Sequence, residues 1–221
     1  MKITKKLIQQ IEKEALEYFV GASGCHDWSH VDRVRNLALH IGKKEKADLN
    51  MLEICAVLHD IGRRDEMKSK GKFCHAEAGA ELASKILHKH KLSKEQIENI
   101  VHSIRSHRYR NSHIPSTLEA KILYDSDKLD SIGAIGVGRA FLFAGSFGSN
   151  NLYTGNEKKL AKSGKEHSYT KEDSPVLEYE IKLKHIKGKM LTKTGKAMAK
   201  QRHDFMEKFF KQFWWEIKGE K

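Results

Sequence analysis

Proline, cysteine and long apolar runs are all scarce in this chain. It has 2 prolines among 221 residues, and apolar residues recur three and four positions apart through most of the sequence, which is the spacing of an amphipathic helix. We therefore predict an all-α fold in which strands are at most a minor part. Because the length suits one hydrophobic core, we expect a single domain over residues 1–221.

Too few cysteines are present for a disulfide framework. Cys25, Cys55 and Cys74 are odd in number and lack the C-x-x-C spacing of thiolate metal sites. No stretch of about 18 consecutive apolar residues occurs, and charged residues interrupt the N-terminal segment where a signal peptide would need an apolar run. We therefore expect a soluble, cytoplasmic protein that does not enter a membrane.

Acidic residues are the minority among the charged ones. Lysine and arginine together number 41 against 29 aspartates and glutamates, which gives a formal net charge of +12. A surplus of positive charge favours anionic partners, which include phosphorylated small molecules and nucleic acids. Charge alone does not choose between these two classes.

Apolar periodicity predicts three helices near the start of the chain. The first covers residues 3 to 20, and the second begins at Asp27 or Ser29, either of which is a suitable cap, and runs to about residue 45. The third is nearly all apolar, is capped by Asp48 and ends near residue 62. Its composition predicts that it is buried.

A fourth helix is predicted over residues 75 to 90. The next two begin with capping boxes, in which a serine and a residue three positions later each bond the backbone of the other. These pairs are Ser93 with Gln96 and Ser116 with Glu119.

The sixth helix is expected over residues 117 to 144, and its glycines indicate close packing or a bend. Residues 145 to 174 are rich in glycine, serine, asparagine, threonine and lysine, which predicts a long polar loop that acts as a mobile lid. Extra C-terminal helices follow, one from near Pro175 and one over residues 194 to 218.

The chain holds 13 histidines, an excess that favours metal or phosphate binding. A His-Asp dipeptide occurs three times, but only one copy follows a buried apolar run. A carboxylate beside an imidazole at the end of a core helix is costly to desolvate unless a cation compensates it. The alternative is a helix end that faces solvent. The three copies are His26-Asp27, His59-Asp60 and His203-Asp204.

A metal site needs further ligands, and two other predicted core helices offer them. His30 lies on the first turn of the second helix, and Asp127 lies inside the sixth helix between Leu123 and Leu129. An aspartate on an otherwise apolar helix face is poorly explained by stability. The combination with His59-Asp60 predicts a metal site.

Four segments resemble the HD-domain metal-dependent phosphohydrolases, whose pattern is a histidine, then a His-Asp pair, then a distant aspartate. The resemblance covers roughly residues 5 to 215. In detail the chain is similar to small bacterial and archaeal HD hydrolases linked to nucleoside triphosphate pyrophosphohydrolysis. The segments are HDWSHVDRVRNLAL, AVLHDIG, EAKILYDSDKLDSIGAIGVGRAF and TKTGKAMAKQRHDFMEKFF.

This resemblance implies a bundle of helices that holds one divalent metal, with Mn, Mg, Co, Ni, Fe and Zn all suited to mixed N and O ligands. It also implies attack of a metal-polarised water on the phosphorus of a nucleotide-like substrate, most simply a nucleoside or deoxynucleoside triphosphate. Asp127 is preferred as a ligand over its neighbours Asp125 and Asp130. The implied ligands are His30, His59, Asp60 and Asp127.

Other residues receive roles from the same resemblance. His75 and His107 match histidines that hold a second metal in binuclear relatives, or else they contact phosphate. Many relatives carry an acidic residue three positions after the His-Asp pair, whereas this chain has Arg63 there. The general base therefore stays open, with Asp65 and Asp130 as the candidates. Basic residues near the motifs that could bind phosphate are Arg63, Arg64, Lys72, Arg105, Arg108 and Lys128.

Three alternatives remain at this stage. The same site would serve a phosphodiesterase or a nucleoside 5'-monophosphatase. The basic run 193–202 would suit a non-enzymatic helical nucleic-acid binder, although a solvated helix face explains it better. A silent HD protein would hold a purely structural metal. The aromatic residues of the last helix suggest a homodimer contact; they are Phe209, Phe210, Phe213, Trp214 and Trp215.

Overall fold

The computed structural model describes residues 2–22, 24–68, 74–109, 113–146, 151–164, 167, 170 and 172–220. Within these residues the secondary structure is helical and no strand occurs, so the predicted all-α class is confirmed. None of the described helices is both long and apolar enough to cross a membrane.

The elements follow one another in two groups. The first group is α1 (Lys5–Leu16), η1 (Glu17–Phe19), η2 (Gly24–His26), α2 (Trp28–Glu45), α3 (Leu49–Leu58), α4 (Arg63–Lys68), α5 (His75–Lys89), α6 (Lys94–Ser106) and α7 (Leu118–Asp130). The second group is α8 (Gly133–Ser146), α9 (Glu157–Ala161), α10 (Pro175–Ile181), η3 (Leu183–Lys189) and α11 (Lys193–Ile217).

The chain forms two compact units, which are described separately. The first contains Met1–Asp127 with Leu191–Gly195, and the second contains Lys128–Met190 with Lys196–Lys221. The single domain expected over residues 1–221 stays a prediction.

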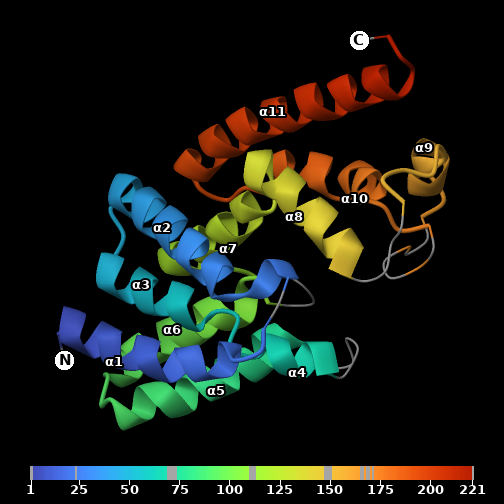
Figure 1. The fold of residues 1–221 in the computed structure, drawn as a ribbon. Coiled ribbons are helices and arrows are strands. Elements are labelled where there is room, and N and C mark those ends of the chain that lie inside the picture. The colour runs from blue at the N-terminus through green and yellow to red at the C-terminus, as the bar shows by residue number, and fades with distance from the viewer. Residues whose placement is uncertain are drawn as a thin grey trace. The chain divides into compact units, whose positions relative to one another are not determined.

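Helix α3 is the centre of the first unit. It packs against α1, α2 and α6, and Figure 1 shows it between α2 and α1. Its apolar composition explains this position, because six of its ten residues are fully buried. The end of α3 therefore delivers the following residues, His59 and Asp60, into the interior.

Side-chain caps fix several helix starts as predicted. Asp27 caps α2 by accepting from the backbone N–H of His30 at 3.3 Å, and Asp48 caps α3. The Ser93–Gln96 capping box at α6 is confirmed.

The capping box predicted at Ser116 is wrong by one residue. Thr117 accepts from the N–H of Ala120 at 3.2 Å, whereas the Ser116 hydroxyl meets His102. Glu119 instead accepts from the Asn99 side chain at 3.1 Å. A tertiary contact thus replaces the local one.

The single helix predicted over residues 117 to 144 is in fact two helices, with a turn at 131–132. Gly133 has φ +81°, a left-handed conformation that suits glycine. A Cβ on Gly136 would lie 2.3 Å from the Ser131 carbonyl oxygen. The glycines therefore mark a break and a close backbone approach.

The predicted loop 145–174 also contains ordered structure. Helix α8 extends to Ser146, and α9 lies inside the segment. Glu157, His167 and Ser174 are buried in the second unit, so the polar composition misled the prediction. Residues 147–150, 165–166, 168–169 and 171 lie outside the described part, and the role of a mobile lid stays a prediction.

Candidate metal centre

Five segments of the first unit bring histidine and aspartate side chains together. His30 lies on the first turn of α2, His75 opens α5, and His107 follows the end of α6. His59 and Asp60 form the turn after α3, and Asp127 lies on α7. Helix ends thus supply all but one of these side chains.

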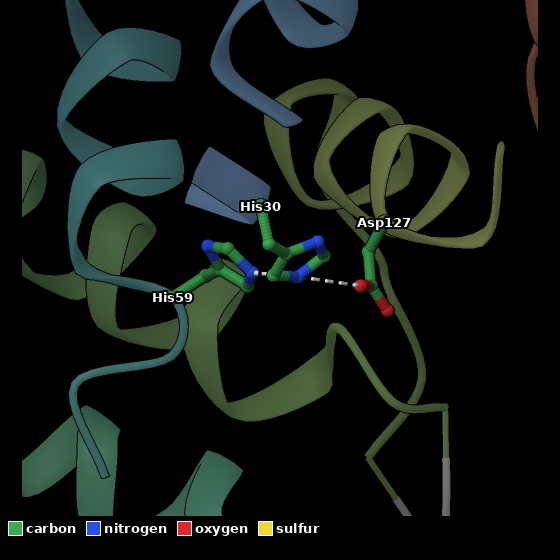
Figure 2. Close-up of side chains that lie close together, drawn as sticks. All are labelled: His30, His59 and Asp127. Atoms are coloured by element: carbon green, nitrogen blue, oxygen red, sulfur yellow. Dashed lines mark hydrogen bonds and ion pairs between the residues drawn. The ribbon is translucent and has the colours of Figure 1, made fainter. Parts of the chain in front are cut away.

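One candidate ligand group consists of His30, His59 and Asp127. The Nε2 atoms of His30 and His59 are 3.2 Å apart, and His30 Nε2 lies 3.5 Å from an Asp127 oxygen. Figure 2 shows the His30 ring between the other two side chains. Both imidazoles are fully buried, while Asp127 is partly exposed.

A second candidate group consists of Asp60, His75 and His107. The Nε2 atoms of the two histidines are 3.2 Å apart, and Asp60 Oδ1 lies 3.1 Å from His75 and 3.7 Å from His107. The other oxygen, Oδ2, lies 3.7 Å from His30 Nε2 and 3.9 Å from His59 Nε2. Asp60 therefore joins the two groups.

Two imidazole Nδ1 atoms of the cluster lie against backbone carbonyl oxygens. His59 Nδ1 lies 2.7 Å from the Ala56 carbonyl oxygen, and His107 Nδ1 lies 2.6 Å from that of Ile104. A neutral imidazole that donates through Nδ1 carries its lone pair on Nε2. Both lone pairs thus point into the cluster, as a metal ligand requires.

Burial favours the neutral form of two histidines of the cluster, His59 and His107. It lowers the pKa of His59 to about 4, although the neighbouring Asp60 carboxylate opposes this change. Burial also lowers the pKa of His107. Burial would raise the pKa of Asp60, but the neighbouring Arg63 guanidinium acts in the opposite direction, and the pKa lies well below its usual value.

The arrangement fits a divalent cation. Asp60 Oδ1 is buried and has no hydrogen-bond partner among the described residues. It faces the Nε2 atoms of His75 and His107, and His107 presents a lone pair rather than a proton. Such buried acceptors are costly unless a cation lies between them.

An ion-pair network borders the second group. Arg63 Nε donates to Asp60 Oδ2 at 3.3 Å, and its Nη1 donates to Glu66 at 2.8 Å. Glu66 also lies 2.7 Å from His75 Nδ1 and 2.6 Å from Arg108 Nη1. The Glu66 carboxylate thereby orients the His75 ring, as carboxylates commonly do for metal-binding histidines.

Glu66 was missed at the sequence level. Its contacts with His75 and Arg108 span 9 and 42 residues, so no helical spacing predicts them. The only local signal is its i, i+3 relation to Arg63, a spacing at which opposite charges meet on one helix face.

The remaining sequence candidates are placed as follows. Asp65 lies on α4, but its side chain is outside the described part of the chain, and so is Lys72. Asp130 belongs to the second unit, where it is buried and pairs with Arg139. Lys128, half-buried, belongs to that unit too.

Asp125, the neighbour that was not preferred as a ligand, has a different partner. Its carboxylate accepts from the backbone N–H groups of Leu191 and Thr192, each at 2.8 Å, and from the Thr192 hydroxyl at 2.6 Å. These bonds tie residues 191–195 to α7.

Known proteins resemble this chain along nearly its whole length. A family model described as the HD domain matches residues 27–132. YpgQ of Bacillus subtilis is 31% identical over 97% of this chain and 95% of its own length. The structure of YpgQ in complex with ADP covers 94% of this chain and 93% of YpgQ, with a TM-score of 0.71 and 29% identity.

A predicted HD superfamily hydrolase from an uncultured Thermotogales bacterium has a similar structure, with a TM-score of 0.64 and 29% identity over 96% of this chain and 92% of its own. This chain therefore belongs to the HD-domain phosphohydrolase superfamily. It is a metal-dependent hydrolase, and the candidate ligand groups contain the histidines and aspartates that such a site needs.

Proposed function

We propose that this protein hydrolyses a phosphoanhydride bond of a nucleoside or deoxynucleoside triphosphate. The main support for this proposal is the metal centre, where Asp60 joins two ligand groups. In both groups buried acceptor atoms face one another. A nucleotide substrate is supported by YpgQ, a relative whose structure contains ADP. The formal net charge of +12 agrees with an anionic substrate.

His30, His59 and Asp127 would hold one divalent cation, with Asp60 as the fourth ligand. When bound, such a cation supplies Lewis-acid activation of water and neutralises charge on phosphoryl oxygens. Manganese is our proposed metal, and the mixed nitrogen and oxygen donors would also accept Mg, Co, Ni, Fe or Zn.

His75 and His107 would hold a second cation that shares the Asp60 carboxylate. The alternative is that they contact a phosphate oxygen directly. The contact of His75 Nδ1 with Glu66 supports the metal role, because it directs Nε2 toward Asp60.

Arg63 has a supporting role in the proposed reaction. A guanidinium stays protonated at neutral pH and cannot act as a general base. It neutralises Asp60 and bridges that residue to Glu66. Asp65 and Asp130 therefore stay the proposed acid–base candidates.

A nucleotide panel tests the proposal. Nucleoside triphosphates, monophosphates and phosphodiesters are incubated with Mn, Mg, Co or Ni, and the products are identified. We expect pyrophosphate from triphosphates. Orthophosphate from monophosphates, or cleavage of diesters alone, would assign the site to a monophosphatase or a phosphodiesterase instead.

Two matched variants show which site is responsible. Asp60→Asn removes the charge that joins the ligand groups, while Asp204→Asn makes the same change at another His-Asp dipeptide. We expect Asp60→Asn alone to abolish turnover. Equal activity in both variants would place the reaction elsewhere.

A further inference from the structure

A cavity of about 400 Å³ lies in the first unit beside the metal centre. Asp60 lines this cavity and also belongs to the second ligand group. The His26 ring lines it too and meets the His30 ring edge to face, with centroids 5.9 Å apart. A ligand in the cavity would therefore touch the residues that surround the reacting phosphate. The lining residues are Tyr18, Phe19, Val20, Gly21, Ala22, His26, Asp60, Arg63 and Arg64.

Two guanidinium groups give the cavity a cationic side. Arg63 bonds Asp60 and Glu66 through Nε and Nη1, and within the described residues its Nη2 has no hydrogen-bond partner. Arg64 is exposed and makes no hydrogen bond or ion pair in the part of the chain that the structure describes. Guanidinium groups bind phosphate oxygens well because their N–H donors form a planar fork.

Two aromatic residues, Tyr18 and Phe19, also line the cavity. Phe19 is buried, and its ring packs edge to face against Trp28 with centroids 5.3 Å apart. Tyr18 is half-buried beside it on the 3-10 turn η1. Flat rings held in this way offer a stacking surface to a heterocyclic base.

We propose that this cavity binds the part of the substrate beyond the reacting phosphate. A further phosphate lies against Arg64 and the Arg63 Nη2 group, and the nucleoside lies against Tyr18 and the Phe19 wall. The volume is within the range of roughly 300 to 1,000 Å³ that is usual for small-molecule sites. This inference rests on the proposed function and adds that the protein selects nucleoside polyphosphates over nucleoside monophosphates.

Binding measurements test the cavity without requiring turnover. Calorimetry of the full-length, Mn²⁺-loaded protein compares a non-hydrolysable nucleoside triphosphate analogue with the matching monophosphate and with inorganic triphosphate. For Arg64→Ala we expect about ten-fold to one-hundred-fold weaker binding of the analogue, because a charge-assisted hydrogen bond is lost. The monophosphate, which lacks the further phosphate, is affected far less.

Tyr18→Ala tests the nucleoside part. We expect roughly ten-fold weaker binding of both nucleotides through lost stacking, and unchanged binding of inorganic triphosphate. Lys44→Ala is the matched control, because Lys44 is an exposed cation 14 residues after His30 on α2, a distance of roughly 21 Å along a helix. It should change none of the three affinities.

The outcomes separate this inference from the proposed function. Unchanged analogue binding in Arg64→Ala, or no binding to the wild-type protein, overturns the assignment of the cavity. A different result would support the role of the cavity and contradict the proposed reaction. In that case the wild-type protein binds the analogue, Arg64→Ala binds it more weakly, and no triphosphate is hydrolysed. A Tyr18→Ala variant that also loses inorganic triphosphate overturns the stacking role.

Discussion

At Asp60, burial raises the pKa of the carboxyl group, whereas the nearby positive charge lowers it. Among the described residues its one permanently cationic partner is Arg63, and its Oδ1 atom has no donor. A carboxylate so deeply buried depends on the charges around it, because the desolvation of a carboxylate costs several kcal/mol. Arg63, which supplies this charge, occupies the position where the family resemblance led us to expect an acidic residue.

The buried histidines predict a pH-dependent stability in the metal-free protein. The folded pKa of His59, about 4, lies below its usual value of 6.5, so between these values only the unfolded chain takes up the proton. Stability is therefore fully present above about pH 6.5 and falls as the pH is lowered toward 4. At its full extent the His59 contribution is about 3 kcal/mol.

Urea unfolding of chelator-treated protein at pH 7 and pH 5 measures this loss of stability. Both pH values lie above the range in which most carboxyl groups titrate. The His59→Asn variant is the comparison, since it lacks the titrating ring. We expect a smaller difference between the two pH values in the variant. An equal difference in both proteins would show that His59 is not the group responsible.

Glu66 gives a second prediction at the residue scale. Glu66→Gln removes the negative charge that His75, Arg63 and Arg108 share. We expect a roughly ten-fold to one-hundred-fold loss of metal affinity or activity, which is usual when a carboxylate that orients a metal-binding histidine is lost.

Glu77→Gln is the control for Glu66→Gln, because Glu77 lies exposed on α5 and pairs only with His113 among the described residues. Metal titration and turnover are measured in both variants. If the two substitutions have equal effects, Glu66 does not orient the site.

At the scale of elements, Gly62 holds the turn after α3 against α5. A Cβ at this position would lie 2.5 Å from the His75 carbonyl oxygen and 2.6 Å from the Gly79 nitrogen. Both are backbone atoms, which cannot rotate away. This contact sets the spacing between Asp60 and the helix that carries His75.

Gly62→Ala should therefore destabilise the protein by about 1 to 3 kcal/mol and weaken metal binding, because α5 must shift. The control is Gly138→Ala in α8, where a Cβ would meet no atom within 4 Å; alanine there should stabilise its helix by roughly 1 kcal/mol. Thermal unfolding and metal titration measure both effects. A stable Gly62→Ala protein with unchanged metal affinity would contradict this view of the contact.

Helix starts were more predictable than helix continuity. Asp27, Asp48 and Ser93 act through bonds to their own neighbours, so their sequence context was sufficient. The break at residues 131–132 depends on Gly133 in a left-handed conformation, and a glycine does not reveal its φ angle in the sequence. Thr117 replaced Ser116 as the cap because His102, distant in sequence, contacts Ser116.

For the molecule as a whole, the sequence indicated which side chains form the metal centre but not that they form two ligand groups. The expectation that His30, His59, Asp60 and Asp127 share one cation stays a prediction, and in the structure Asp60 also lies beside His75 and His107. Which side chains share a group depends on how the ends of α3, α5 and α6 pack against one another. Glu66 and the Tyr18–Arg64 cavity likewise depend on contacts between segments that no local pattern connects.

The geometry around Asp60 implies that its neighbouring side chains hold a divalent cation. Calorimetric titration of the metal-free protein with Mn²⁺ measures this binding, with Asp60→Asn and Asp204→Asn compared at pH 7. We predict that the wild-type and Asp204→Asn proteins bind Mn²⁺ and that Asp60→Asn binds it at least ten-fold more weakly. A ten-fold loss of affinity corresponds to about 1.4 kcal/mol of lost attraction between the carboxylate and the cation. Equal Mn²⁺ affinity in all three proteins would contradict this prediction.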